Sequence, residues 1–276
     1  MLLVLNVNNT NTVIALYALT PTGHTGELRA TWRISTRQGQ TADEYGILVR
    51  SLLQSENVET SAIRGIVIAS VVPPIDWILR QFCDRYFGQK PLFIEPGVKT
   101  GLPILTDNPG EVGADRVANC VGAFHKYGGP TIVVDFGTAT NFDVVSKKGE
   151  FLGGAIAPGL NVSAEALFAR AARLPRVEIR RPAKIIGTNT VDNLQIGLFW
   201  GHIGLVDSIL ERMIAELGPE TKCVATGGLA HLIARESKHI SDVNDRLTLE
   251  GLRLIYDRNR VARNQSEPQP ARTHGA

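Results

Sequence analysis

The hydrophobic pattern of the chain alternates between short apolar runs and longer stretches with helical spacing. Segments with strand character lie at residues 3–5, 13–17, 27–35, 63–72, 90–94, 131–135, 142–145, 149–157 and 222–226. Helical patterns cover residues 41–53, 73–86, 117–124, 161–173, 190–217 and 248–256. A short apolar run bounded by turn residues is typical of a strand, and apolar residues that recur every three or four positions are typical of one helix face. The sequence therefore predicts an α/β fold.

Two segments repeat the same pattern at an offset of 129 residues. Residues 3–12 and 132–141 each combine an apolar run with a small polar turn rich in Asn, Gly and Thr, and a second apolar run follows each turn. Each segment is typical of a β-hairpin whose turn could face phosphate. Because the offset is nearly half the chain, it predicts two related lobes rather than a solenoid of short repeats. Residues 95–113, rich in Gly and Pro, are the expected crossing between the lobes.

Composition narrows the class of protein. Of 276 residues, 43% are hydrophobic and 20% are charged, which supports a large core and excludes intrinsic disorder or a small disulfide scaffold. The net charge of +2 arises in residues 257–276, and the rest of the chain holds 25 residues of each sign. A balanced body lacks the clustered basic face that binds nucleic acid, so we expect no nucleic-acid partner.

Cysteine usage and hydropathy bear on location. The chain has three cysteines, Cys83, Cys120 and Cys223, which lie far apart in the sequence. An odd number at wide spacing favours reduced, mostly buried thiols in a cytoplasmic protein. The apolar N-terminus is too short for a signal peptide, and no run approaches the ~18 apolar residues of a membrane span. We therefore expect a cytoplasmic protein with no membrane partner. We also expect residues 259–276 to be disordered.

Three turns have a composition suited to a nucleotide. Residues 6–13 and 135–140 occupy matching positions in the repeat, and small polar turns bring N–H groups and hydroxyls close to phosphate oxygens. One such turn usually only closes a hairpin, but two related by duplication predict a cleft with a phosphate turn on each side. The third turn, residues 226–229, lies between a strand and a helix, where a flat adenine could approach the backbone. The P-loop motif is absent from the sequence.

A charged pair lies just before the helix expected from Val117. In the segment Gly113-Ala114-Asp115-Arg116, one interpretation makes Asp115 an N-cap that accepts free N–H groups of the helix. The other makes Asp115 a catalytic carboxylate that takes a proton from a substrate hydroxyl, while Arg116 binds a carboxylate or phosphate. The spacing alone leaves both interpretations open.

Several ordered motifs together resemble the type III pantothenate kinases, which belong to the actin-like and sugar-kinase superfamily. The motifs are Gly113-Ala114-Asp115-Arg116, Val134-Asp135-Phe136-Gly137-Thr138-Ala139-Thr140, Gly153-Gly154-Ala155-Ile156-Ala157-Pro158-Gly159, Thr226-Gly227-Gly228-Leu229-Ala230 and Thr248-Leu249-Glu250-Gly251-Leu252. The resemblance implies two duplicated actin-like (ribonuclease H-like) lobes around a nucleotide cleft. We place the lobes at residues 1–112 and 113–258, with a tail at 259–276.

The resemblance also implies an activity, which is phosphorylation of pantothenate by ATP, the first step of coenzyme A biosynthesis. It implies magnesium, a monovalent cation (potassium or ammonium) and a homodimer with the pantothenate site close to the interface. Asp115 matches the proton acceptor, and Asp135 matches the aspartate that holds potassium. The implied substrate contacts are Gly113, Ala114, Asp115, Arg116 and Thr190. The implied ATP contacts are Asn6, Val7, Asn8, Asn9, Thr10, Asn11, Thr12, Val13 and Thr138.

The first phosphate motif departs from the family pattern. The family usually has Asp-Val-Gly-Asn-Thr, whereas this chain has Asn6-Val7-Asn8-Asn9-Thr10. The internal repeat shows the same difference, because Asn6 aligns with Asp135. A charge pair at ~4 Å is worth about 4 kcal/mol at an effective dielectric of ~20, so losing the carboxylate weakens metal binding. This departure favours an alternative, a catalytically weak or inactive paralogue that acts as a nucleotide- or metabolite-binding regulatory protein.

Two other positions differ from the family. Asn8 replaces a glycine, and because Asn tolerates positive φ better than most residues, we expect the turn to form. Thr106 lies where the family often has Tyr near the substrate, which affects one pantothenate contact rather than the reaction.

Overall fold

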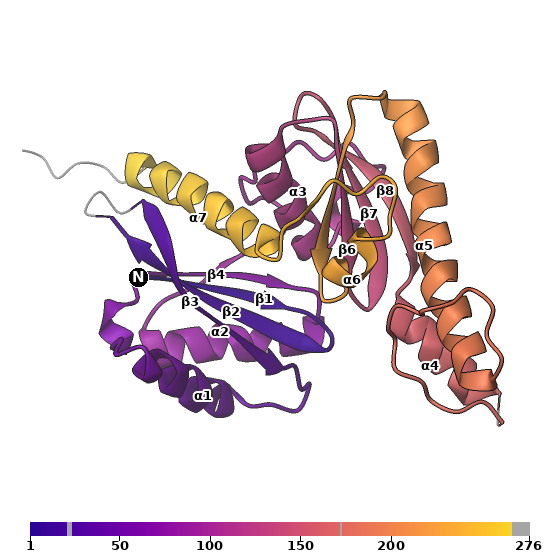
Figure 1. Cartoon of the computed structure of the whole chain (residues 1–276). Helices are drawn as coiled ribbons and strands as arrows, with labels where there is room; N and C mark the ends of the chain where they lie inside the picture. The colour runs from indigo at the N-terminus through magenta and orange to yellow at the C-terminus, as the bar shows by residue number, and fades with distance from the viewer. Residues whose placement is uncertain (21–23, 172, 267–276) are drawn as a thin grey trace, which may run out of the picture. The chain divides into compact units, whose positions relative to one another are not determined.

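The computed structural model describes residues 1–20, 24–171 and 173–266 (Figure 1). These residues form two compact units: one is Met1–Gly101 together with the described residues from Leu252 onward, and the other is Leu102–Gly251. Each unit contains a five-stranded sheet, ordered β3-β2-β1-β4-β5 in the first and β8-β7-β6-β9-β10 in the second. The predicted α/β class is confirmed.

The two sheets share one topology. In each, the first three strands are antiparallel neighbours and the last two run parallel to the first strand. The strands are β1 (Leu2–Val7), β2 (Asn11–Leu19), β3 (Thr25–Ser35), β4 (Gly65–Ser70), β5 (Leu92–Phe93), β6 (Thr131–Phe136), β7 (Ala139–Val145), β8 (Phe151–Pro158), β9 (Lys222–Gly227) and β10 (Asp242–Val243). Asn6 and Asp135 are both the last but one residue of their strands. The duplication read from the sequence is therefore confirmed in the strand order and in the position of these two residues.

The first unit packs two helices on one face of its sheet and a third along the other (Figure 1). Helices α1 (Ala42–Ser55) and α2 (Pro73–Phe87) cover the first face, where Tyr45, Leu79 and Phe82 join the core. Helix α7 (Leu247–Ser266) lies along the other face, and its Asp257 accepts hydrogen bonds from the backbone N–H and hydroxyl of Thr25 on β3.

The second unit places its helices on opposite faces of its sheet (Figure 1). Helix α3 (Ala114–Tyr127) covers one face, and α5 (Thr190–Leu217) and α6 (Ala230–Ala234) cover the other, next to α4 (Leu160–Arg170). Alternate residues of β6 face the two layers: Val134 packs with Phe199 of α5, and Val133 packs with Ala123 of α3. Strand alternation thus decides which polar residues of β6 and β7 lie against α3.

Local signals explain where the helices begin. Thr41 caps α1 by accepting the N–H of Glu44, and the Glu44 carboxylate accepts the N–H of Thr41 in return. Pro73 opens α2 at a position where its missing N–H costs nothing, and Asn189 caps α5 through the N–H of Asp192. These starts were predicted within one residue.

The structure differs from the sequence prediction at several places. Helix α3 begins at Ala114 rather than Val117, β10 was not predicted, and α7 continues to Ser266, into the segment expected to be disordered. Residues 267–276 of that segment lie outside the described residues. The domain limits at 112 and 258 stay a prediction. The two compact units divide near 101 and 251, and backbone hydrogen bonds join Leu105 and Pro103 to Phe151 of the second sheet.

Two other expectations concern cysteines and membranes. Cys83, Cys120 and Cys223 are free and buried, as the sequence predicts. None of the described helices combines the length and apolarity that a membrane crossing requires.

Close packing between α3 and α7 gives a prediction about Gly251. A Cβ at this position would overlap the carbonyl oxygen of Ala118 on α3, so we expect Gly251→Ala to destabilise the protein by ~3 kcal/mol in chemical unfolding. The control is Gly204→Ala in α5, where a Cβ meets nothing within 4 Å. A better helix former there should be neutral or stabilising by up to ~1 kcal/mol. Equal effects of the two substitutions would contradict the packing argument.

Candidate functional site

A layer of polar side chains lies between α3 and the sheet of the second unit. Asp135 on β6 and Asp143 on β7 face α3, and Arg116 and Asn119 of α3 face back toward them. Arg116 and Asn119 are three residues apart, which places both on one side of the helix. Val133, Ala123 and Leu247 form the apolar part of the same interface. The site is therefore built on two strands and one helix rather than on loops.

Arg116 and Asp143 form a largely buried ion pair. Nε of Arg116 donates to Oδ1 of Asp143 at 2.8 Å, and Nη2 lies 2.6 Å from the same oxygen in the ion pair. The Asp143 side chain is fully buried, and that of Arg116 is 17% exposed. Oδ2 of Asp143 is also buried and has no hydrogen-bond partner among the described residues. Because ordinary buried carboxylates have both oxygens satisfied, this pair is a candidate for a functional role.

Asn119 links Asp135 to the first turn of α7. Its amide nitrogen donates to Oδ2 of Asp135 at 3.0 Å, and its oxygen accepts the hydroxyl of Thr248 at 2.6 Å. Asn119 is fully buried. Both ends of its side chain are thus engaged, and they fix the orientation of the Asp135 carboxylate.

Asp115 is the second residue of α3, and its position settles one open question. The N-cap is Gly113, so the interpretation of Asp115 as N-cap is wrong. The cause is that α3 begins three residues earlier than predicted. Oδ1 of Asp115 accepts the N–H of Arg116 at 2.8 Å, and the positive end of the helix dipole stabilises its charge. The Asp115 side chain is half-buried.

Burial raises the pKa of all three carboxyl groups. The pKa of Asp135 rises to about 7, through burial and then through the charge of Asp115. The pKa of Asp143 rises to about 6 through burial, although the Arg116 guanidinium opposes the rise. Burial also raises the pKa of Asp115, against the hydrogen bond from the Arg116 N–H. The carboxyl groups also influence one another, since the charge of Asp115 raises the pKa of both Asp135 and Asp143.

Gly227 leaves room for the Asp135 carboxylate. It ends β9 with a φ of +94°, and a Cβ there would lie 2.6 Å from Oδ1 of Asp135. Gly228 follows with no atom within 4 Å of an added Cβ. The turn therefore lies between a strand and a helix as predicted, beside the acidic end of β6.

The first unit presents Asn6 at the position that matches Asp135. Asn6 is 6% exposed, and its Oδ1 is buried with no hydrogen-bond partner among the described residues. Thr12 is fully buried and shares a 2.8 Å hydrogen bond with Thr36. Asn9 and Thr10 are exposed in the hairpin turn. An unsatisfied amide oxygen beside a turn with exposed polar groups fits a bound polar ligand.

The turn of this hairpin forms without the backbone strain that the sequence suggests. Asn8 donates its N–H to the carbonyl of Asn11 at 3.0 Å, and Val7 pairs with Thr12 across the hairpin. Among described residues other than glycine, positive φ occurs at Asn57, not at Asn8. The turn survives the loss of glycine as predicted, but tolerance of positive φ is not the reason.

The remaining predicted residues of the second unit lie apart from each other. Thr138 is exposed in the turn between β6 and β7, and its carbonyl accepts the N–H of Gly159 at the start of α4. Thr190 is exposed at the first position of α5, the helix that packs on the opposite face of the sheet from α3. No hydrogen bond between described residues joins Thr190 to Asp115 or Arg116.

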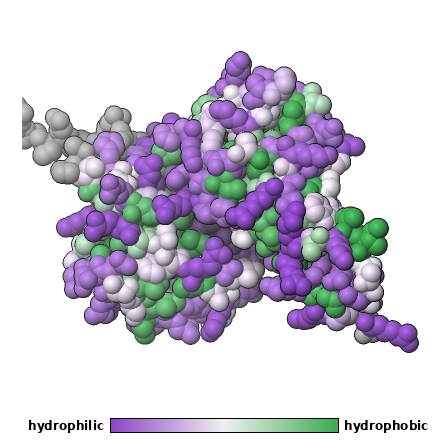
Figure 2. Space-filling view, viewed as in Figure 1, coloured by the Kyte–Doolittle hydropathy of each residue, from purple (hydrophilic) through white to green (hydrophobic). Residues whose placement is uncertain are grey.

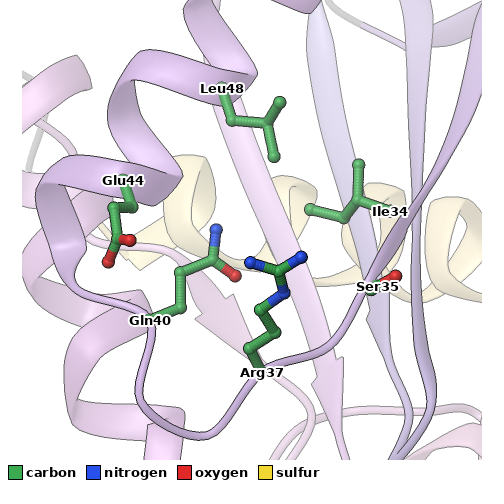
Figure 3. A pocket seen from close by; sticks show the side chains of 6 residues that line it. All are labelled: Ile34, Ser35, Arg37, Gln40, Glu44 and Leu48. Atoms are coloured by element: carbon green, nitrogen blue, oxygen red, sulfur yellow. The ribbon is translucent and has the colours of Figure 1, made fainter.

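A separate cavity lies in the first unit, between the end of β3 and α1 (Figure 3). It has a volume of about 210 Å³, and it is lined by Ile34, Ser35, Arg37, Gln40, Glu44 and Leu48. The sequence predicts none of these residues as functional. Glu44 is already engaged in the α1 capping box, so the cavity does not add an acid or base to the site.

Comparison with known proteins decides the family. The model of the type III pantothenate kinase family matches residues 2–212. The chain belongs to the type III pantothenate kinases. A type III pantothenate kinase from Acidobacterium capsulatum is 79% identical over 96% of this chain and 98% of its own length. One from Koribacter versatilis (strain Ellin345) is 60% identical over 94% and 96%.

A solved structure supports the fold. The activator of the 2-hydroxyisocaproyl-CoA dehydratase from Clostridium difficile, with bound ADPNP, matches with a TM-score of 0.53 and 13% identity. The match covers 97% of this kinase and 98% of that chain. At this identity the likeness shows the fold alone, which is the actin-like fold with duplicated lobes. The predictions of family, fold and pantothenate kinase activity are confirmed, and the relatives favour the kinase over the regulatory alternative.

The sequence missed Asp143 and Asn119. Asp143 interrupts the apolar run of β7, and Asn119 lies on the apolar face of α3. The available signal was a polar residue at an otherwise apolar, core-facing position. Such a signal does not show which residue the polar side chain contacts. Within the described residues, no group of three or more His, Cys, Asp or Glu is arranged to hold a metal ion.

Proposed function

We propose that Asp115 is the general base of this pantothenate kinase. The observation that supports it is the half-buried Asp115 carboxylate with raised pKa, next to a guanidinium oriented by an ion pair. In the reaction, the primary hydroxyl of pantothenate attacks the γ-phosphorus of ATP and loses its proton to Asp115. The new O–P bond forms as the bond between the γ-phosphorus and the β–γ bridging oxygen breaks, and its electron pair leaves with ADP.

Arg116 is proposed to bind the carboxylate of pantothenate. A guanidinium presents pairs of N–H donors that match the two oxygens of a carboxylate. Gly113 and Ala114 precede the reacting carboxylate at the start of α3, where free backbone N–H groups favour anions. This segment therefore recognises the acid end of the substrate and positions its hydroxyl.

The nucleotide contacts proposed for this kinase are residues 6–13 and Thr138. The exposed turn residues Asn9 and Thr10 offer N–H groups and a hydroxyl to phosphate oxygens. Oδ1 of Asn6, buried without a partner, fits a ligand for hydrated magnesium. Magnesium, when bound with ATP, would neutralise phosphate charge.

Asp135 is proposed to hold a monovalent cation, potassium or ammonium. Its pKa of about 7 reflects burial and the charge of Asp115, and a bound cation would favour the ionised form. Asn119 orients the carboxylate through its amide nitrogen. The cation would add positive charge close to the transferred phosphate.

A homodimer is proposed from exposed apolar side chains in the second unit. Leu152 and Ile156 are exposed on β8, which is the edge strand of its sheet, and Ile185 and Ile186 are 65% and 78% exposed. Figure 2 shows hydrophobic atoms at the outer edge of this unit, beside α5. Exposed apolar edges are typical of protein interfaces. In such a dimer, the second copy would supply Thr190 to the substrate, because α5, which begins with Thr190, and α3 lie on opposite faces of the sheet.

The cytoplasm is the proposed location. Three buried free thiols are compatible with a reducing compartment, and ATP is the proposed phosphoryl donor.

A coupled assay tests the proposed function. Purified protein with ATP, magnesium, potassium and pantothenate should release ADP and form 4'-phosphopantothenate. Sedimentation analysis of the same sample should give the mass of a dimer. Turnover no higher than that of an Asp115→Ala control would contradict the catalytic role of Asp115, and a monomer mass would contradict the dimer.

Asn6 gives a prediction that separates the kinase from the regulatory alternative. Asn6→Asp places a charged carboxylate at a site that is 6% exposed, so without added magnesium we expect the thermal midpoint to fall by ~5 °C. Magnesium and ATP should raise the thermal midpoint of Asn6→Asp by more than they raise that of the natural protein. We expect turnover to change by less than tenfold. A rise of about a hundredfold or more would favour the weakly active alternative.

A further inference from the structure

The two contacts between Arg116 and Asp143 use a single edge of the guanidinium. Nε and Nη2 lie on that edge: Nε donates a hydrogen bond to Oδ1, and Nη2 makes the ion-pair contact with the same oxygen. The adjacent edge, made of Nη1 and the second hydrogen of Nη2, has no hydrogen-bond partner among the described residues. A planar guanidinium held along one edge has a fixed direction for the other edge. Asp143 therefore sets where the remaining donors of Arg116 point.

Two further features fix the orientation of the Arg116 guanidinium. The guanidinium carbon lies 5.6 Å from the centre of the Phe151 ring, which packs against one side of the group. Asp143 itself lies on β7, paired with Val133 of β6 on one side and with Gly154 of β8 on the other. A residue inside a sheet, with strands on both sides, has little freedom to move. The pair is thus a rigid support for a side chain that is still 17% exposed.

We infer that Asp143 is a positioning residue that orients Arg116 to select substrates with a carboxylate. The inference rests on the proposed function of Arg116. The free edge of the guanidinium offers two parallel N–H donors, and a carboxylate accepts both of them. A neutral amide or alcohol at the same place accepts fewer charge-assisted hydrogen bonds. The negative charge of Asp143 lowers the net positive charge at the site, so Asp143 does not strengthen the attraction for a carboxylate. Its contribution is to orient the Arg116 guanidinium.

The unpaired oxygen of Asp143 supports a functional role over a purely structural one. Oδ2 is buried with no hydrogen-bond partner among the described residues, although a carboxylate placed for stability alone would have both oxygens satisfied. Replacing the pair by apolar side chains would avoid burying an unsatisfied oxygen. Retaining it makes physical sense if Arg116 has to present its outer edge to a ligand.

The test measures binding of two ligands that differ at the acid end. Isothermal titration calorimetry compares pantothenate with pantothenol, in which a neutral alcohol replaces the carboxylate, for the natural protein and for Asp143→Asn. We expect the natural protein to prefer pantothenate by at least ~10-fold, as two charge-assisted hydrogen bonds allow. In the variant we expect this preference to fall below ~3-fold, while affinity for pantothenol changes by less than ~2-fold.

Control variants and outcomes separate orientation from folding. Glu236→Gln removes the charge from another arginine–carboxylate pair of the same unit, Arg181 with Glu236, and should leave the preference unchanged. If Asp143→Asn keeps the natural preference, or loses affinity for both ligands equally, the inference is wrong. The same holds if the natural protein shows no preference. If Asp143→Asn does not fold, Asp143→Glu is measured by the same criteria. A natural protein that forms no 4'-phosphopantothenate would instead contradict the proposed function.

Discussion

An Asp115→Asn variant should lose 10²- to 10⁴-fold in kcat, with the KM for ATP changed by less than about threefold. The substitution keeps the size of the side chain and its ability to accept the N–H of Arg116. It removes the negative charge, and with it the basicity that the carboxylate needs to take the substrate proton. The measurement is steady-state kinetics of ADP release with pantothenate varied at saturating ATP.

The pH profile gives a second readout for the same residue. Burial raises the pKa of Asp115 above its usual value, and a base must be deprotonated to act. We therefore expect kcat/KM of the natural protein to fall as pH decreases through this raised pKa, and the residual activity of the variant to lack that fall. Asp43→Asn is a matched control, because Asp43 is also an acidic residue in the first turn of a helix, α1, and pairs with Arg85. If Asp115→Asn kept the kcat of the natural protein, the proposal that Asp115 is the general base would be wrong.

Much of the fold could be predicted because local signals and hydrophobic pattern agree. The capping residues Thr41 and Asn189 and the proline at 73 fix helix starts within a few residues of sequence. The repeat predicted two related lobes, since two hairpins with the same pattern fold in the same way, and the shared strand order agrees with it. The start of α3 was missed because Gly113 caps it with backbone alone, without the side chain that usually marks an N-cap.

The sequence predicted those residues of the candidate site that belong to short motifs. Asp115 and Asp135 belong to such motifs, and the resemblance assigned them roles. Asp143 and Asn119 act through partners 27 and 16 residues away in the chain, across the interface of α3 with the sheet. Contacts of that kind depend on which face of the sheet packs against α3. The sequence alone does not show which residue of the helix each strand residue contacts. A structure was needed to find the pair Arg116–Asp143.

Asp135→Asn should abolish activation by potassium and lower kcat by about 10²-fold at saturating potassium. A carboxylate and a cation at ~4 Å attract by about 4 kcal/mol at an effective dielectric of ~20, and desolvation offsets part of this. The amide oxygen of Asn can still accept from Asn119, so the orientation of the side chain should persist. The measurement is turnover against potassium concentration, with sodium replacing potassium at constant ionic strength.

Stability supplies a readout for Asp135 that is independent of turnover. The folded pKa is about 7, above the usual value of 3.8, so the folded state binds more protons than the unfolded state between these values. The contribution of this group to stability is therefore lost as pH rises from about 4 to 7. Without potassium, the thermal midpoint of the natural protein should decrease over this range more than that of Asp135→Asn. Potassium should restore the natural protein at pH 8 and leave the variant unchanged, because only a carboxylate gains from the cation. Equal responses of both proteins to potassium would place the cation elsewhere.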